Sequence, residues 1–407
     1  MVLSQRGRKL IESPPMSEYA QVHRVRALNP FHPEHNPDGY IPLCVAENKL
    51  IAPMVAERIA AVPDMPLNLM GYQPMTGSVE LRVALARFME RSLLGRPVDP
   101  EELAVLAGAG SVLEIMFAAL CDPGDGVLVP TPSYAGFWAD LETRDEITIV
   151  PVHCSSENGF ELTTELLDRA LADADRPIRA LLFTSPNNPL GWTYTPDEIA
   201  EIVEWAETND IHLVMDEIYA LSVFGDTAFT SAAAVVDDLG DNIHIVWAFS
   251  KDFGASGLRA GVLWTRNEEL LDAVESLGYW AMVSGHTQHV LADMVCDEGW
   301  LDGFVEELRR GLREAHSAVT DALVTIGVPV IPSDAGIFLM CDMRPHMAEV
   351  SWRAEQNLWQ RILDTTNVNL TPGSACRVGE PGFFRLCFAA VPTPTAVEAI
   401  ERVGNVL

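Results

Sequence analysis

The chain has 407 residues and a formal net charge of −31, from 58 Asp and Glu against 27 Lys and Arg. Its length predicts one large domain plus a smaller one. So acidic a surface disfavours nucleic acid and anionic membranes as partners and slightly favours cationic small molecules, although solubility alone explains it more simply. No apolar run reaches the length of a membrane-spanning helix, so no membrane association is expected.

The expected location is the cytoplasm. The first residues, MVLSQRGRKLIESPP, are basic, but no apolar stretch follows them. This pattern is not typical of a signal peptide. The seven cysteines are scattered, odd in number and form no Cys-x-x-Cys pair. Free thiols in a reducing compartment fit this better than a disulfide framework or a zinc site, and no metal is expected.

Residues 1–55 are predicted to form an N-terminal arm and part of a small domain, 56–295 a large domain, and 296–407 the rest of the small domain. From about residue 100, short apolar runs alternate with helical patterns. Thr195-Pro196-Asp197-Glu198 is a capping box with proline at the first helical position, which predicts a helix to about Asn209. This alternation predicts an α/β fold: a mostly parallel sheet sandwiched by helices.

The pattern changes after about residue 290. A long charged helix is expected over 301–326, ended by Gly327, and strands over 337–342 and 383–389 flank a further helix. These elements predict a smaller α+β domain. Chemistry in a parallel sheet collects at the carboxyl ends of its strands, which is where the polar motifs of this chain fall.

Ser250 and Lys251 end an apolar run and are followed by DFGASGLRAG, with Arg259 eight residues after the lysine. A lysine at a strand end is usually a solvated surface group. The glycine-rich continuation and the arginine instead suit an amine that forms a Schiff base with pyridoxal 5'-phosphate (PLP), beside a phosphate site. Lys251 is therefore predicted to carry the cofactor.

Three further motifs suit the same cofactor. Asp216 ends another apolar run, and a carboxylate there can keep a pyridine nitrogen protonated, although Asp alone is as readily a helix cap. Asn188, in SPNNPLG, and Tyr219 can contact the ring oxygen, but Asn and Pro also favour ordinary turns. Gly110 and Ser111 precede a helix whose N-terminus can bind phosphate, a weak signal by itself.

Two residues are candidates for contacts with the ring and the substrate. Tyr134, in PTPSYAGF, can stack on the cofactor ring, although a loop tyrosine is more often simple packing. Arg385 lies within the apolar run FFRLCFA. A buried arginine needs a partner, so either a substrate carboxylate or a structural ion pair is expected.

In this order the motifs resemble those of fold-type-I PLP enzymes, the aspartate aminotransferase superfamily, over essentially the whole chain. Within them the chain is most similar to 1-aminocyclopropane-1-carboxylate (ACC) synthases. The similarity rests on Val45-Ala46-Glu47-Asn48 and on the stretches PTPSYAGFWADL, SPNNPLG, HLVMDEIYALSVF, FSKDFGASGLRAG and LTPGSACRVGEPGFFRLCFA. Plain aminotransferases lack the last of these.

The resemblance implies a role for each motif. Lys251 would be the Schiff-base lysine and the general base at Cα, Asp216 the partner of the pyridine nitrogen, and Arg385 the clamp on the substrate carboxylate. Glu47 would lie near the sulfonium of S-adenosylmethionine (SAM). The remaining cofactor contacts would come from Asn188, Tyr219, Tyr134, Gly110, Ser111, Ser250 and Arg259, with Asn188 and Tyr134 also near the substrate.

The resemblance further implies a homodimer with the active site at the subunit interface. Tyr72 matches the spacing of a tyrosine that contacts the cofactor phosphate of the neighbouring subunit in aminotransferases. Residues 284–289 match another segment that, in relatives, reaches the neighbouring subunit's cofactor. The implied reaction is cleavage of the Cγ–S bond of SAM with release of methylthioadenosine, by a lyase.

The chain also departs from the ACC synthase pattern. Ala248 replaces a serine three residues before the lysine, Met75 stands in a segment that is usually Tyr-His-Gly, and Lys49 replaces a glutamine. Two alternatives therefore stay open: a biosynthetic enzyme that couples the four-carbon fragment of SAM to a second, pyridinium-type substrate, and an aminotransferase. A degenerate fold that only binds or regulates is disfavoured because all the cofactor residues are present.

Overall fold

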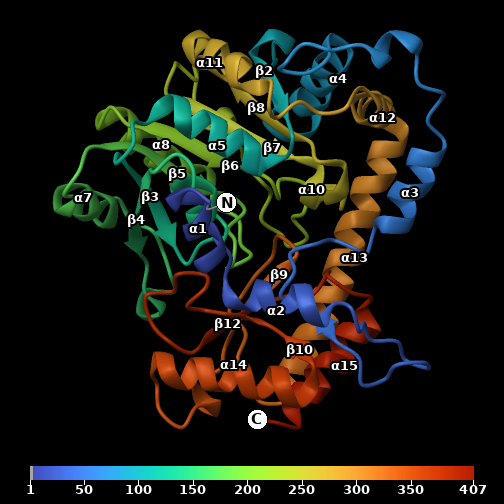
Figure 1. Cartoon of the computed structure of the whole chain (residues 1–407), viewed down its shortest axis with the longest axis vertical. Helices are drawn as coiled ribbons and strands as arrows, with labels where there is room; N and C mark the ends of the chain where they lie inside the picture. The colour runs from blue at the N-terminus through green and yellow to red at the C-terminus, as the bar shows by residue number, and fades with distance from the viewer. Residues whose placement is uncertain (1–2) are drawn as a thin grey trace.

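The computed structural model describes residues 3–407 and has two lobes, with a seven-stranded sheet in the larger one (Figure 1). The strands, in spatial order, are β2 (Leu103–Leu106), β8 (Gly261–Thr265), β7 (Ile243–Ala248), β6 (His212–Asp216), β5 (Ile178–Thr184), β3 (Gly126–Thr131) and β4 (Thr148–His153). Strand β8 runs antiparallel to both its neighbours, and the other pairs are parallel. The predicted mostly parallel sheet is confirmed.

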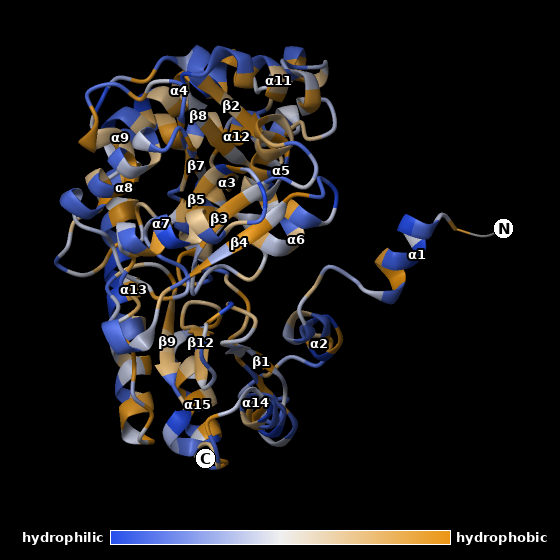
Figure 2. Cartoon of the chain, turned by 90° about the vertical axis from the view of Figure 1, so that its left-hand side faces the viewer, coloured by the Kyte–Doolittle hydropathy of each residue, from blue (hydrophilic) through white to orange (hydrophobic). Residues whose placement is uncertain are grey.

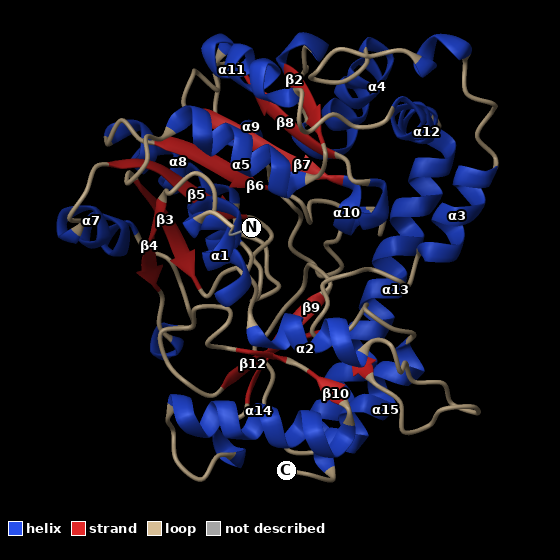
Figure 3. Ribbon diagram, in the orientation of Figure 1, coloured by secondary structure: helices blue, strands red, loops and turns tan. Residues whose placement is uncertain are grey.

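Helices cover both faces of this sheet (Figure 3). Successive residues of β7 pack into different apolar clusters: Ile245 and Trp247 point to one face and Val246 to the other. A strand buried on both sides in this way carries no polar alternation. The helices of this lobe are α4 (Val79–Met89), α5 (Ala109–Leu120), α6 (Phe137–Glu142), α7 (Thr164–Asp173), α8 (Pro196–Thr208), α9 (Ala232–Val235), α10 (Phe249–Asp252), α11 (Glu268–Gly278) and α12 (Gly285–Cys296).

The capping box forms as predicted at the start of α8. The hydroxyl of Thr195 accepts from the backbone N–H of Glu198, whose carboxylate accepts in return from the Thr195 N–H. The helix ends at Thr208, one residue before the predicted end. Such differences of a residue are ordinary at helix termini.

The smaller lobe contains an antiparallel sheet of β11 (Thr371–Pro372), β12 (Phe383–Cys387) and β9 (Phe338–Asp342), and a parallel pair of β1 (Ile41–Pro42) with β10 (Val368–Asn369). Helices α14 (Trp352–Thr366) and α15 (Thr393–Gly404) pack below, and α13 (Glu298–Thr325) runs between the lobes (Figure 1). The long helix begins before its predicted start at 301 because Asp297 caps it, accepting from the Trp300 N–H. Strand β12 ends at Cys387, shorter than the predicted 383–389.

The N-terminal segment forms α1 (Gln5–Glu12) and α2 (Glu18–Arg26), followed after β1 by α3 (Ala52–Ala60). Figure 2 shows α1 standing away from the two lobes, and an ion pair of 2.9 Å between Arg6 and Glu146 links it to the loop between α6 and β4. The strands are the apolar centre of both lobes in the same view. Among residues 3–407, no helix is both long and apolar enough to cross a bilayer.

Candidate active site

The site lies where strands β5, β6 and β7 end. The register pairs Thr184 of β5 with Asp216 of β6, so their side chains leave the sheet at one level. Strand β7 runs parallel beside β6 and leads directly into α10, which carries Lys251. The carboxyl edge of a parallel sheet is where such folds bind ligands, because polar side chains from separate segments converge there.

Lys251 points into the molecule. Its Nζ donates a hydrogen bond of 2.5 Å to the carbonyl oxygen of Ala46, in the loop between β1 and α3. Burial lowers the pKa of Lys251 below its ordinary value, which favours the neutral amine that acts as a nucleophile. The chain has only two other lysines, and both Lys9 and Lys49 are exposed.

Asp216 is buried at the end of β6, only 6% exposed. Burial raises the pKa of its carboxyl to about 7, against hydrogen bonds from the Ile218 N–H and Thr184 and the charge of Lys251, which lower it. An acid in this state gains from a cation placed against it, because the pair removes an unfavourable buried charge. A protonated pyridine nitrogen is such a partner.

Asn188, Tyr219 and Arg385 form one hydrogen-bonded network. Asn188 donates from Nδ2 to the Tyr219 hydroxyl at 3.2 Å and accepts at Oδ1 from Nη1 of Arg385, also at 3.2 Å. Nη2 of Arg385 donates to the Cys44 carbonyl and to Thr371. All three side chains are almost completely buried.

Arg385 keeps an unused donor. Its Nε has no hydrogen-bond partner within the described part of the chain, and no carboxylate forms an ion pair with the guanidinium there. A buried guanidinium without an anion is unfavourable, and a bidentate carboxylate is the ligand that matches its shape. The alternative of a structural ion pair for Arg385 is therefore excluded within residues 3–407, and a substrate carboxylate fits.

A second cradle surrounds the start of α5. Gly108 has a φ of +93°, and a Cβ there would lie 2.5 Å from Nη2 of Arg259. Arg259 itself is held by hydrogen bonds to the carbonyls of Ser256 and Ala107. Gly110 and Ser111 lie in the first turn of α5. Backbone N–H groups, the helix dipole and a guanidinium thus converge on one point, an arrangement that suits a phosphate group.

The remaining residues predicted from the sequence to contact the cofactor differ in their exposure to solvent. Ser250 is buried on α10 beside Lys251. The Tyr134 ring packs edge-on against Phe137, and a Cβ on Gly136 would lie 2.4 Å from it, so the glycine makes room for the ring. Tyr72 is 88% exposed on a surface loop and does not join the site of its own chain.

Glu47 lies at the edge of the site. Oε1 accepts from the Ser256 hydroxyl at 3.3 Å, and Oε2 is 3.6 Å from Nζ of Lys49. The carboxylate is close enough to Lys251 to raise the pKa of that lysine against the larger lowering by burial. The acid expected near the substrate thus acts on the amine through its charge and contacts Ser256 and Lys49.

Sequence reasoning missed three residues. Asp252 is fully buried and accepts hydrogen bonds from the Leu221 N–H, the Ser222 hydroxyl and the Trp247 indole. Its position next to Lys251 was the available signal. Nothing in the sequence singled out Tyr19, whose pKa burial raises and the nearby Arg385 lowers, or Cys387, two residues along β12 from Arg385 and close to Lys251.

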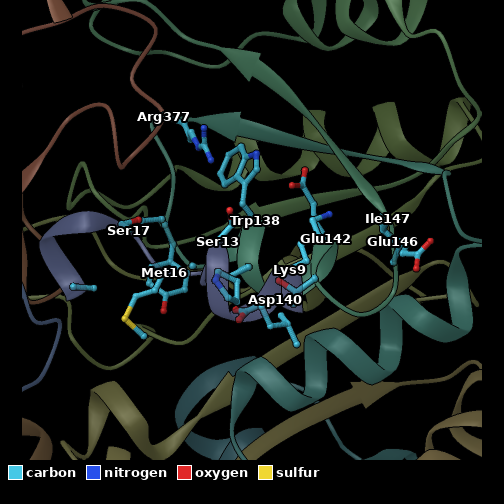
Figure 4. A pocket seen from close by; sticks show the side chains of 18 of the residues that line it. Lys9, Ser13, Met16, Ser17, Trp138, Asp140, Glu142, Glu146, Ile147 and Arg377 are labelled. Carbon is cyan, nitrogen blue, oxygen red and sulfur yellow. The ribbon is translucent and has the colours of Figure 1, made fainter. Parts of the chain in front are cut away.

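A cleft of about 1160 Å³ opens beside the site, between α1 and α6 (Figure 4). Tyr134 and Asp140 line it, and so do Trp138 and Arg377, whose guanidinium carbon lies 4.7 Å from the centre of the indole ring. Burial raises the pKa of Asp140 to about 6. Because Tyr134 belongs to both, the cleft leads toward the buried polar centre.

The described residues fit PLP at each of its functional groups. Lys251 would hold the aldehyde carbon, Asp216 the pyridine nitrogen, Asn188 and Tyr219 the ring oxygen, and the Gly108 turn with Arg259 the phosphate. The fold and the site define a PLP-dependent enzyme.

Comparison with known proteins agrees with this. The sequence pattern of the aminotransferase class I and II family matches residues 40–403, and the chain belongs to that family. It is 36% identical over 395 residues to 1-aminocyclopropane-1-carboxylate synthase 2 of Cucurbita pepo, which covers 93% of this chain and 80% of the relative. It is 35% identical over 405 residues to 1-aminocyclopropane-1-carboxylate synthase 6 of Arabidopsis thaliana, covering 95% and 82%.

Solved structures show the same fold. A single mutant of aspartate aminotransferase from Thermus thermophilus superposes with a TM-score of 0.81 at 24% identity, covering all of both chains. The Pyrococcus protein A1 superposes with a TM-score of 0.82 at 23% identity, covering 99% of this chain and 98% of the other. The aspartate aminotransferase-like fold inferred from sequence is confirmed.

Proposed function

We propose that this enzyme cleaves the Cγ–S bond of SAM and releases methylthioadenosine, in the manner of an ACC synthase. The observation that carries the proposal is the placement of charges around Lys251. The buried Arg385 guanidinium and the Glu47 carboxylate both lie close enough to influence the Lys251 amine. A substrate with a carboxylate at one end and a cationic sulfur at the other matches this pair.

Each of these residues would act on a particular atom of the substrate or the cofactor. Arg385 holds the substrate carboxylate, and Lys251 takes the proton from Cα, with a lowered pKa that leaves its amine able to accept one. Bound PLP would supply an electron sink for the negative charge that develops at Cα. Asp216 keeps the proton on the pyridine nitrogen, and Asn188 and Tyr219 hold the ring oxygen.

The bond changes balance without a further reactant. The electron pair left at Cα forms the Cα–Cγ bond, and the Cγ–S pair leaves with the sulfur, which becomes the neutral thioether of methylthioadenosine. Lys251 takes up the Cα proton and then releases it to solvent, which returns the neutral amine. A sulfonium is a good leaving group, so the protein needs only to orient it, and Glu47 does so by its charge.

A second candidate is capture of the four-carbon fragment by another substrate. The cleft of about 1160 Å³ that Tyr134 lines supports it, because it offers room for a second molecule beside the site. The departures Met75, Ala248 and Lys49 are compatible with a changed outcome after Cγ–S cleavage. An aminotransferase is the third possibility, because the same fold and cofactor serve that reaction.

The deciding experiment is incubation of the PLP-loaded enzyme with SAM, followed by mass spectrometry of methylthioadenosine and of all four-carbon products. Methylthioadenosine with ACC supports the first candidate. Methylthioadenosine without ACC, but with an adduct when a pyridinium compound is added, supports the second. Amino-group exchange with 2-oxoglutarate and no methylthioadenosine under any condition replaces both with an aminotransferase.

A further inference from the structure

The carboxylate proposed to meet the sulfonium already has a cation beside it. Nζ of Lys49 lies 3.6 Å from Oε2 of Glu47, while Oε1 accepts from Ser256. Both carboxylate oxygens are therefore engaged in the free enzyme. The side chains of Lys49 and Glu47 are 52% and 40% exposed, so this ion pair is wet and can open.

We infer that Lys49 determines specificity by competing with the substrate cation for Glu47. The inference rests on the proposed function. A Glu47 carboxylate without a counter-ion would prefer a sulfonium to a neutral thioether. With Lys49 in place the pair has no net charge, and the ammonium also repels a second cation that approaches the same carboxylate.

The other charges near the site do not restore this preference. Arg385 is cationic, and Asp216, the other acid that acts on the Lys251 amine, is buried at the end of β6, where it suits the pyridine nitrogen. Glu47 is thus the acid at the edge of the site that can select for positive charge. A group that neutralises the charge of Glu47 therefore changes the relative affinity for cationic and neutral ligands.

Position 49 can be changed without disturbing the fold. Its backbone N–H donates to the Ala389 carbonyl at 2.9 Å, a bond that any residue except proline keeps. The side chain is exposed and makes no other ion pair within the described chain. Lys49→Gln therefore removes the charge and retains the length of the side chain.

The test compares SAM with S-adenosylhomocysteine, its neutral thioether analogue, on the PLP-loaded enzyme. Binding is followed by stopped-flow absorbance of the cofactor before turnover, and the ratio of the two dissociation constants is the readout. Lys49→Gln should raise the preference for SAM by about threefold to tenfold, the effect of a half-exposed pair. Glu47→Gln should lower it below wild type, and 0.5 M salt should shrink the gain of Lys49→Gln.

Arg353→Gln, an exposed charge change on α14, is the control and should leave the ratio unchanged. The inference is overturned if Lys49→Gln leaves the ratio within twofold of wild type or lowers it, or if the gain persists in the double variant with Glu47→Gln. If the wild-type enzyme binds neither ligand, the proposed function itself fails and the inference falls with it. If both bind and the ratio does not move, only the inference fails.

Discussion

Arg385 donates a hydrogen bond of 3.2 Å to Asn188, although 197 positions separate them in the chain. The bond joins β12 of the smaller lobe to the loop that follows β5 of the larger one. Since Asn188 also donates to Tyr219, the proposed substrate clamp and the proposed contacts to the cofactor ring form one buried unit. The geometry of this unit fixes the guanidinium before any ligand arrives.

We expect Arg385→Lys to weaken substrate binding about tenfold to a hundredfold, some 1.4–2.8 kcal/mol, because an ammonium cannot make the paired contacts of a guanidinium. The absorbance of the bound cofactor should stay as in wild type. Titration of the holoenzyme with substrate, followed by the cofactor spectrum, measures both. A variant that loses PLP while binding substrate normally would assign Arg385 to the cofactor instead.

Lys251→Ala should abolish the absorbance of lysine-bound PLP and essentially all turnover, because the two other lysines, Lys9 and Lys49, are exposed and do not lie at the buried end of the strands. Borohydride reduction of the wild-type holoenzyme followed by peptide mass spectrometry should place the pyridoxyl group on Lys251. Lys9→Arg, a change of an exposed lysine on α1, serves as the control and should behave as wild type. A pyridoxyl group on Lys9 or Lys49, or turnover by Lys251→Ala without added amine, would refute the assignment.

Local patterns were enough to predict the sheet, helix α8 and the residues around Lys251. Each of these rests on contiguous signals: an apolar run, a capping box, or a lysine before a glycine-rich turn. The network of Arg385, Asn188 and Tyr219 was suggested residue by residue, but its hydrogen bonds depend on two lobes meeting, which no local pattern encodes.

Other features could not be predicted from the sequence, because they also depend on contacts between distant segments. Tyr19 approaches Arg385 only because α2 packs beside β10, where the Asn369 side chain donates to the Tyr19 carbonyl. The three donors to Asp252 come from two separate segments. The cleft between α1 and α6 likewise arises from a tertiary arrangement, because residues far apart in sequence line it.

Asp216 makes the stability of the cofactor-free protein depend on pH. Its folded pKa of about 7 lies above the ordinary value of 3.8, so the folded state binds the proton more tightly and stability falls as pH rises through this window. We expect Asp216→Asn to stabilise the apo-protein relative to wild type, by about 2 kcal/mol more at pH 8.5 than at pH 5.5.

Urea unfolding of both apo-proteins at the two pH values measures this difference. With PLP bound, the order should reverse at pH 8.5, since the pyridinium then pairs with the wild-type carboxylate and turnover of the variant should be far lower. Equal stabilities of the two apo-proteins at both pH values would show that Asp216 does not carry the buried charge.

Asp252 is expected to position the turn that carries Lys251. Asp252→Asn keeps the shape but turns an NH₂ group toward at least one of the three donors from Leu221, Ser222 and Trp247, which should cost about 1–3 kcal/mol of stability. Turnover should fall with substrate affinity nearly unchanged, because Arg385 is untouched. Asp321→Asn, on the exposed face of α13, is the matched control. A purely structural role would lower stability and leave kcat per folded enzyme unaltered.

Tyr72 is expected to complete the site of a second copy of the chain. It is 88% exposed, and exposed apolar side chains at Leu67, Met70 and Trp280 are of the kind that a partner covers. Light scattering should therefore give at least a dimer. Tyr72→Ala should lower turnover strongly while leaving its own Lys251 intact.

Mixing inactive Lys251→Ala with Tyr72→Ala subunits tests the shared site directly. Half of the randomly formed dimers are hybrids, and each hybrid has one site built from the intact Lys251 of one subunit and the intact Tyr72 of the other. About a quarter of wild-type activity should return after the subunits are unfolded and refolded together. Mixing without refolding is the control and should restore nothing while dimers do not exchange. If the refolded mixture gains no activity although hybrids form, Tyr72 acts within its own subunit or not at all.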